Sequence, residues 1–433
     1  MLTFKNIIAV IIVSCALLPL PVTSQAAESK LRNLQDWLYD NHQTELNGFV
    51  EMRAGVRTNR ELDEKDLSIG EARLQLDLSK VMDWGTLKLK TDLVGDTVDE
   101  TAIADLRELN LLFSPLDNMD VKVGRQVLTW GTGDLLFIND LFPKDWVSFF
   151  IGRDDEYLKA PSDAIKTSLF FDTANIDFVY MPTFNNSNYI DGSRLSYWNP
   201  ILGRNAGRDF VFDDNQRNSF DEDDSAAMRI SKNISGVEYA LYGYYGFWST
   251  PKGLDPVAMR LTYPGLAVYG GSVRATLLGG IGNFEFGYYD SLDDQDGDNP
   301  LLPNSEFRAM TGFERELGQN LTGSVQYYME WKQDYDEYET FLPAGMKKDD
   351  EYRSLLTLRI TKLLKNQTLR LSAFAYYSPT DNDSYLRAKA HYKVTDQWAV
   401  EAGGNIFLGA DDHTFFGQFE DNTNIFAGLR RSF

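Results

Sequence analysis

Basic residues recur on one side of four of the last five strand-like segments of the chain. Each segment has apolar side chains at every second position, so the basic residues share the opposite, polar side. This expected basic wall consists of Arg353, Arg359, Arg370, Arg387, Lys389 and Arg430. Guanidinium groups bind carboxylates through paired hydrogen bonds, so the wall predicts recognition of anions by attraction.

Acidic residues stand on the same polar side of the segments that precede this wall. They are Glu238, Glu285, Glu314 and Glu330, beside Arg274 and Arg308. In a confined space, a basic wall next to a more acidic one would focus the electrostatic potential on passing ions. The alternative is that these charges pair across neighbouring strands and stabilise the wall. Such ladders are expected in the early strands, from Arg53, Arg73, Lys88 and Lys90 with Glu51, Glu71, Asp77 and Asp92.

Several tyrosines share the polar side with these charges, among them Tyr244, Tyr328 and Tyr376. Aromatic rings along a polar passage can hold sugar rings or an apolar solute. Beside arginines, they would suit an anionic saccharide or an aromatic acid. The alternative is that the rings pack against other parts of the interior.

Residue types that carry covalent or metal chemistry are scarce. The sequence has three histidines, His42, His391 and His413. They form no zinc-binding pair, no Gly-x-Ser-x-Gly elbow is present, and the single cysteine, Cys15, leaves the rest of the chain without a thiol. Asp294, Asp296 and Asp298 resemble part of a calcium loop, but no bidentate Glu follows at the required spacing. We therefore expect no enzymatic activity, no cofactor and no metal.

Period-two alternation runs through most of the chain. It predicts eighteen strands, from Leu46–Thr58 to Asn424–Phe433, whose connections alternate between tight turns such as Asn233-Ile-Ser-Gly236 and longer loops. An even strand count and this long-short alternation are typical of a closed antiparallel transmembrane β-barrel with short periplasmic turns and long extracellular loops. A soluble β-sandwich also alternates, but the terminal strand ends in an aromatic residue, as expected of a barrel whose last strand pairs with its first.

The N-terminal region has a separate character. Lys5 followed by the apolar run 7–18 and small residues at 24–26 predicts a signal peptide over residues 1–26. Lipoprotein processing at Cys15 is the alternative. Residues 27–43 are expected to form a periplasmic or plug helix, and residues 44–433 the transmembrane β-barrel.

Composition supports export to a membrane and argues against a nucleic-acid partner. The 433 residues carry a formal charge of −22, which would repel a phosphate backbone. Mean hydropathy is −0.34 with 13% aromatics, which is too polar for a bundle of membrane helices and typical of a barrel with a wet interior. The predicted location is the bacterial outer membrane.

The connection Thr129–Ser162 is too apolar for a loop that stays in water. Its expected constriction residues are Trp130, Asp134, Phe137, Asn139, Asp140 and Trp146. Folding into the mouth of the barrel would bury this surface and narrow the passage. Packing over the outer rim or against a partner is the alternative, because exposed apolar patches mark interaction sites.

Short motifs in and before this loop carry a family resemblance. Gly124-Arg125-Gln126, Trp130-Gly131, Gly133-Asp134, Asn139-Asp140 and Pro143-Lys-Asp145-Trp146 resemble a segment of porin-like outer-membrane proteins related to the alginate-export barrels. That family has Pro after the Asn, where this chain has Asp140. The resemblance covers under a tenth of the chain and implies a substrate-selective channel.

Together these features predict an outer-membrane channel for passive passage of small or oligomeric, anionic solutes such as a saccharide or an organic acid. The expected partners are outer-membrane lipid, lipopolysaccharide, the barrel-assembly machinery and the solutes themselves, with a monomer favoured over an oligomer. The alternative is a scaffold barrel that sheathes a periplasmic or secreted partner such as a multihaem cytochrome.

Overall fold

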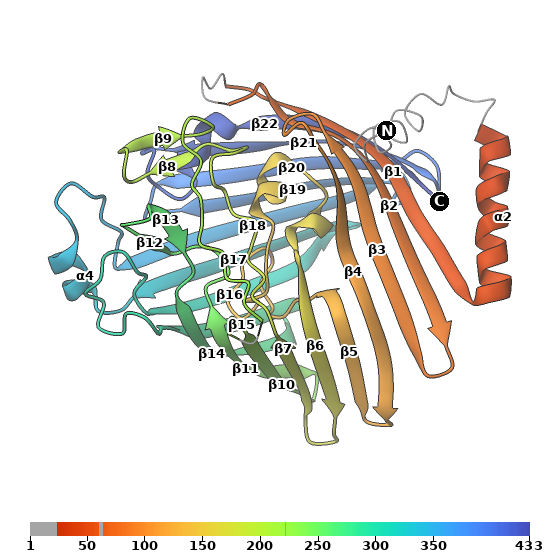
Figure 1. Ribbon diagram of the computed structural model, residues 1–433, viewed down its shortest axis with the longest axis horizontal. Helices are drawn as coiled ribbons and strands as arrows, with labels where there is room; N and C mark the ends of the chain where they lie inside the picture. Colours follow the sequence, from red (N-terminus) through yellow and green to blue (C-terminus); the bar gives the residue numbers. More distant parts are fainter. Residues whose placement is uncertain (1–23, 60–63, 221) are drawn as a thin grey trace.

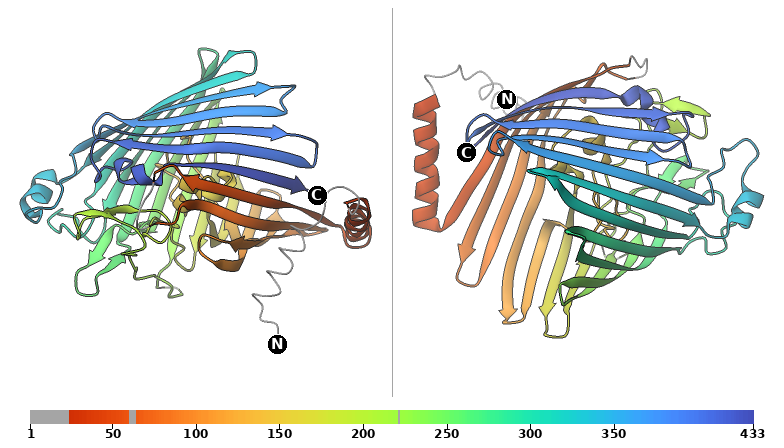
Figure 2. Two further views of the ribbon diagram at one scale, coloured as in Figure 1. Left: turned by 90° about the horizontal axis from the view of Figure 1, so that it is seen from above. Right: turned by 180° about the vertical axis from the view of Figure 1, so that it is seen from behind.

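Eighteen antiparallel strands form one sheet that closes into a barrel (Figures 1 and 2). The computed structural model describes residues 24–59, 64–220 and 222–433. The barrel strands are β1 (Thr44–Arg57), β2 (Leu67–Met82), β3 (Gly85–Asp96), β4 (Thr101–Leu116), β5 (Met119–Val127), β6 (Pro161–Phe170), β7 (Asn175–Met181), β10 (Ser225–Ile234), β11 (Val237–Phe247), β14 (Gly265–Leu277), β15 (Gly280–Ser291), β16 (Glu306–Gly318), β17 (Leu321–Lys332), β18 (Tyr352–Leu364), β19 (Leu369–Ser378), β20 (Asp383–Lys393), β21 (Trp398–Gly409) and β22 (Asn424–Ser432). The predicted fold class and strand count are confirmed.

The barrel closes by pairing its last strand with its first. β22 runs antiparallel to β1, with Met52 opposite Leu429. Beyond the strand, the backbone N–H of Phe433 donates to Gly48 O at 3.0 Å and the N–H of Gly48 donates to Phe433 O at 3.1 Å. Closure gives every described strand of the barrel a partner on both sides, which is what a sheet in lipid requires.

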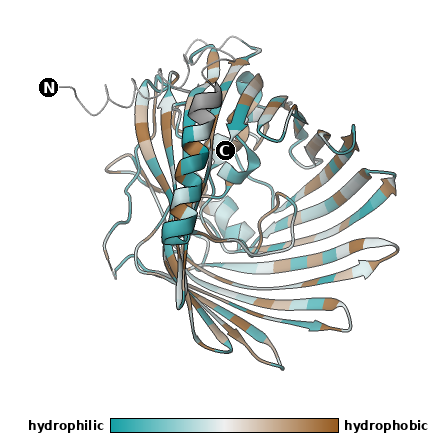
Figure 3. Cartoon of the chain, turned by 90° about the vertical axis from the view of Figure 1, so that its right-hand side faces the viewer, coloured by the Kyte–Doolittle hydropathy of each residue, from teal (hydrophilic) through white to brown (hydrophobic). Residues whose placement is uncertain are grey.

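The two faces of the sheet differ in polarity as the alternation predicts. On β17 the outward Val325 and Tyr327 are 48% and 43% exposed, while the inward Gln326 is buried. Figure 3 shows hydrophobic and hydrophilic residues alternating along the strands. Apolar residues on the outer surface suit lipid, so the faces are those of a membrane barrel and not of a sandwich.

The connections differ in length at the two ends of the barrel (Figure 1). One end has tight turns, such as Ser235-Gly236, in which both residues have positive φ and reverse the chain within two residues. The other end has long loops, which contain short elements of their own. These are β8 (Tyr197–Asn199), β9 (Arg204–Ala206), β12 (Gly253–Asp255), β13 (Arg260–Thr262), α4 (Tyr335–Phe341) and η2 (Gly417–Asn422).

Helix α2 (Ser24–His42) lies outside the sheet, at the end with the tight turns (Figure 1). The side chain of Gln35 on this helix contacts the barrel, where its Nε2 donates a hydrogen bond to Leu46 O of β1 at 2.8 Å. No helix in the described ranges combines the length and the apolar character that crossing a membrane requires. The predicted signal peptide and Cys15 lie outside the described residues, apart from residues 24–26, which belong to α2.

Candidate channel constriction and outer vestibule

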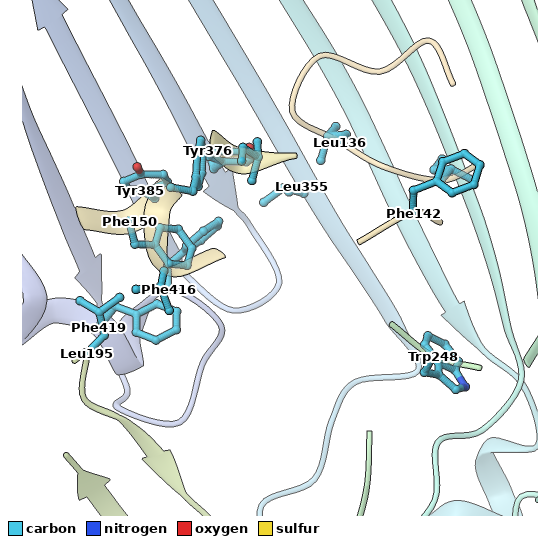
Figure 4. Close-up of a cluster of buried hydrophobic side chains, with 14 of the residues drawn as sticks. Leu136, Phe142, Phe150, Leu195, Trp248, Leu355, Tyr376, Tyr385, Phe416 and Phe419 are labelled. Atoms are coloured by element: carbon cyan, nitrogen blue, oxygen red, sulfur yellow. The ribbon is translucent and has the colours of Figure 1, made fainter. Parts of the chain in front are cut away.

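The loop between β5 and β6 runs inside the barrel. It contains α3 (Trp146–Ile151) and η1 (Asp155–Leu158), and its apolar side chains pack on inward-facing rings of the wall. The Phe150 ring lies 5.3 Å from that of Tyr385 and 5.2 Å from that of Phe407. Figure 4 shows Phe150 beside Tyr385 and Phe416. We call residues 128–160 the luminal loop.

Helix α3 is short and is fixed at both ends. Asp145 caps its N-terminus, with Oδ1 accepting from the Ser148 backbone N–H at 2.7 Å. Gly152 ends it in the left-handed conformation, at φ 90°. A Cβ at Gly152 would overlap the ring of Phe426, and Gly152 O accepts from Arg53 Nη1 at 2.6 Å. The loop therefore meets the wall at a point where only glycine fits.

A buried carboxylate anchors the first half of the luminal loop. Glu285 on β15 is 1% exposed and accepts four hydrogen bonds from the loop. The backbone N–H and Oγ1 of Thr132 donate to Oε2 at 2.6 and 2.8 Å, and the backbone N–H and Nδ2 of Asn139 donate to Oε1 at 2.8 and 3.0 Å. Among the described residues no cation forms an ion pair with Glu285. Its charge is used to fold the loop onto the wall.

The other motif residues are also structural. Gln126 is fully buried and donates to Ala164 O at 3.0 Å, and Arg125 pairs with Asp163 at 2.8 Å. Trp130 packs edge-on against Phe142 at 5.0 Å. Asp140 lies 2.9 Å from Lys144 Nζ. These motif residues thus shape and attach the luminal loop.

The predicted basic wall meets carboxylates of this loop. Arg359 Nε lies 2.8 Å from Asp134 Oδ2, and Arg387 Nη2 lies 2.9 Å from Asp155 Oδ1. Arg430 Nη2 lies 3.3 Å from Asp154 Oδ2. With Lys389, which lies 3.3 Å from Asp155, four of the six predicted wall residues are thus paired with the loop that crosses the lumen.

Lys389 is shared between the luminal loop and the wall, whereas Arg353 and Arg370 have no partner in the loop among the described residues. Lys389 lies between Asp155, at 3.3 Å, and Glu401, at 3.5 Å. Arg353 pairs with Asp381 at 2.6 Å. Arg370 is exposed near the tight turns, and no ion pair is formed with it among the described residues. The wall is therefore not a continuous free basic surface, because the luminal loop supplies counter-charges that strand alternation alone cannot reveal.

The loop carboxylates differ in their protonation properties. Burial raises the pKa of Asp134, and the nearby Arg359 offsets this only in part. Burial also opposes ionisation of Asp155, but Arg387 and Lys389 outweigh it and hold its pKa below the ordinary value. The pKa of Asp154 is lowered against burial in the same way, by Arg430 and Lys389. Asp154 and Asp155 thus favour the ionised form while the luminal loop is docked, that is, packed against the wall.

The opposite end of the luminal loop is attached to β2 and β3. Arg153 Nη2 donates to Glu71 Oε1 at 2.6 Å, and Tyr157 Oη donates to Asp92 Oδ2 at 2.7 Å. Arg73 on β2 also pairs with Asp92 on β3, at 2.6 Å, which is the cross-strand pairing expected of a ladder. Arg153 and Tyr157 were not among the predicted site residues, because no periodicity indicates where a loop side chain points.

Above the luminal loop lies a cavity of about 640 Å³, which we call the outer vestibule. Six of the predicted residues line it: Phe137, Asp140, Trp146, Tyr328, Arg353 and Tyr376. Tyr376 also donates to Leu135 O at 2.7 Å, and Tyr328 donates to Glu330 Oε1 at 2.6 Å. Tyr244 is buried elsewhere and donates to Phe247 O at 3.0 Å. Other lining residues, such as Trp248 and Phe416, lie in loops and were not predicted.

The acidic loop considered for calcium shows no assembled ligand set. In the described part of the chain, no group of three or more His, Cys, Asp or Glu side chains is placed to hold a metal ion. Asp294 instead accepts from the backbone N–H of Asn299 at 3.2 Å.

Solved structures share this architecture. OccAB3 from Acinetobacter baumannii is 9% identical, with 90% of this chain and 99% of that chain covered and a TM-score of 0.54. The chain has the porin fold. OccD3 (OpdP) from Pseudomonas aeruginosa is 10% identical over 90% of both chains, with a TM-score of 0.53. OccK5 (OpdH) from the same organism is 10% identical over 90% of this chain and 97% of that chain, with a TM-score of 0.54.

No protein-family model and no curated protein matches the sequence. The resemblance to the alginate-export family therefore rests on the short motifs alone. The predicted location in the bacterial outer membrane agrees with the porin fold and with the apolar outer surface of the barrel.

Proposed function

We propose that this chain is a passive outer-membrane channel for small solutes, narrowed by the luminal loop. The observation that carries the proposal is the attachment of this one loop to opposite parts of the wall. It is held by Glu285 on β15 through Asn139, at 2.8 Å, and by Glu71 on β2 through Arg153, at 2.6 Å. A loop tied at both sides of the lumen sets the width of whatever passage remains beside it.

The side chains that line the lumen suit a channel better than an enzyme. They are paired charges and packed aromatic rings, and His391 Nδ1 lies 3.4 Å from Glu401 Oε2. Selective passage needs such a lining, whereas general-base catalysis needs a positioned reacting partner.

The finer proposal is a modest preference for anionic solutes such as organic acids or acidic saccharides. Basic residues still outnumber acidic ones on the wall formed by β18 to β22. Carboxylates of the luminal loop neutralise much of this excess positive charge. Anion preference therefore depends mainly on basic side chains outside the ion pairs described above, such as Arg370. We therefore expect weaker anion selectivity than the wall sequence alone predicts.

The sheathing alternative gains no support from these observations. A barrel that encloses another protein must leave its interior free, and here the chain's own loop occupies that space. We also propose that outer-membrane lipid and lipopolysaccharide surround the barrel, that the barrel-assembly machinery inserts it, and that it acts as a monomer.

Liposome swelling tests the proposed channel. Proteoliposomes should swell in isosmotic solutions of small sugars and organic acids, and the rate should fall steeply as solute size increases. Proteoliposomes that swell no faster than empty liposomes with any small solute would contradict the proposal. Heat-modifiable electrophoretic mobility of the same sample serves as the control for a folded barrel.

A further inference from the structure

The outer vestibule has an aromatic and aliphatic lining drawn from several separate loops. Trp248 and Leu254 come from the β11–β14 connection, Phe416 from the β21–β22 connection and Trp146 from the luminal loop. Figure 4 shows Trp248 on one side of the close-up and Tyr376 and Phe416 toward the other. A volume of about 640 Å³ lies within the range of pockets that enclose a small organic molecule.

Most charged groups that line the vestibule are already paired, either within the wall or within the luminal loop. Arg308 Nη2 lies 2.6 Å from Glu306, and its guanidinium covers the Tyr289 ring at 4.0 Å. Arg353 is paired with Asp381 and Lys144 with Asp140, at 2.6 and 2.9 Å. A charged ligand would have to compete with these ion pairs.

One further cation stands at the edge of the vestibule. Lys252 is exposed, its Nζ lies 5.9 Å from the Trp248 ring centre, and no ion pair is formed with it in the described residues. Its position in solvent makes it a weak determinant, because exposed charges are well screened. The enclosed part of the vestibule therefore offers a ligand mainly ring faces, ring edges and aliphatic groups.

We propose that the outer vestibule is a binding site for an uncharged, ring-bearing apolar solute, held there before it passes the luminal loop. The site goes beyond the proposed anion preference and rests on the proposed channel function for passage itself. Aromatic rings of a solute gain edge-on and offset contacts against such walls, whereas the hydroxyl groups of a sugar would be buried there with few hydrogen-bond partners. The bound solute would be concentrated at the point where the passage narrows.

Binding is measured with 1-naphthol and the full-length protein in lipid nanodiscs, by equilibrium dialysis against empty nanodiscs. We expect saturable uptake in excess of the empty discs, approaching one molecule per chain. Leu254→Asp should weaken binding at least tenfold, because it places a carboxylate in the vestibule wall. Phe416→Ala, in a different loop, should weaken it several-fold by removing a ring face.

Val257→Asp is the matched control. Val257 lies in the same hairpin as Leu254 but is 93% exposed and does not line the vestibule, so binding should be unchanged. The proposal is overturned if uptake is not saturable, if Val257→Asp weakens binding as much as Leu254→Asp does, or if 1-naphthoate binds more than tenfold more tightly than 1-naphthol.

The site and the channel can fail separately. Swelling of proteoliposomes without naphthol binding would overturn the vestibule site and leave the channel standing. Saturable naphthol binding without any swelling would overturn the channel and leave an apolar binding site.

Discussion

Asn139 donates two hydrogen bonds to a single carboxylate oxygen of Glu285, from its backbone N–H at 2.8 Å and from Nδ2 at 3.0 Å. The two residues lie 146 positions apart in the sequence. This contact converts an acidic wall residue into an attachment point for the luminal loop. The width of the proposed channel thus depends on a buried carboxylate that does not face the solute.

Replacing Glu285 with Gln should loosen the luminal loop. The amide nitrogen would face N–H donors of Thr132 or Asn139, and each unsatisfied buried group costs about 1–3 kcal/mol. Single-channel conductance should rise, and the loop should become more sensitive to added protease. Glu314→Gln removes the same charge from an exposed position on β16 and should change neither. Equal effects from both variants would contradict the anchoring role.

Removing the two loop carboxylates should unmask the basic wall. In Asp154→Asn/Asp155→Asn, the partners of Arg430 and Arg387 lose their charge, so the reversal potential under a salt gradient should shift toward stronger anion preference. Asp411→Asn/Asp412→Asn, in the exposed β21–β22 connection, removes the same charge without taking a partner from Arg430 or Arg387 and should give a smaller shift. A shift of the same size in both double variants would indicate a general charge effect.

Acid should release this part of the loop. The pKa values of Asp154 and Asp155 are lowered in the docked loop, so their contribution to docking is complete above about pH 3.9, the ordinary value for Asp. It is lost as the pH falls through the lowered values. Asp134 has a raised pKa because it is buried, so its protonation favours docking and does not release the loop. Conductance should be flat from pH 7 to about pH 4 and rise below; a double Asn variant that still shows this rise would refute the assignment.

Gly152→Ala should lift α3 from the wall. Alanine in the left-handed region costs about 1–2 kcal/mol, and its Cβ would overlap the Phe426 ring. Gly203→Ala provides the control, because Gly203 also has positive φ, at 63°, but has no atom within 4 Å of the added Cβ. We expect lower thermal stability of the loop and higher conductance in the first variant alone, measured by protease protection and bilayer recording.

The strands were predictable because alternation encodes both their position and their inward face. Inward Tyr328, Tyr376 and Arg359 were assigned correctly to the polar side, since a strand has only two faces. The partner of Arg359 was not predictable, because Asp134 belongs to a loop whose path depends on where its aromatic residues find a wall to pack against. The roles of Arg153 and Tyr157, which attach the loop to β2 and β3 across the lumen, were not predictable for the same reason.

The outer vestibule was beyond prediction for a related reason. Its wall combines Trp248, Leu254 and Phe416 from loops whose sequences look like separate irregular segments. Their apolar character was visible in the sequence, but their convergence on one cavity is a product of barrel closure.

Planar-bilayer recording of the purified full-length protein under a salt gradient tests the central claim most directly. We predict discrete, small single-channel conductances with a reversal potential that indicates weak anion preference, as expected of a wide barrel narrowed and largely neutralised by its own loop. No conductance from a folded barrel, or a large conductance unchanged by Glu285→Gln, would contradict this account.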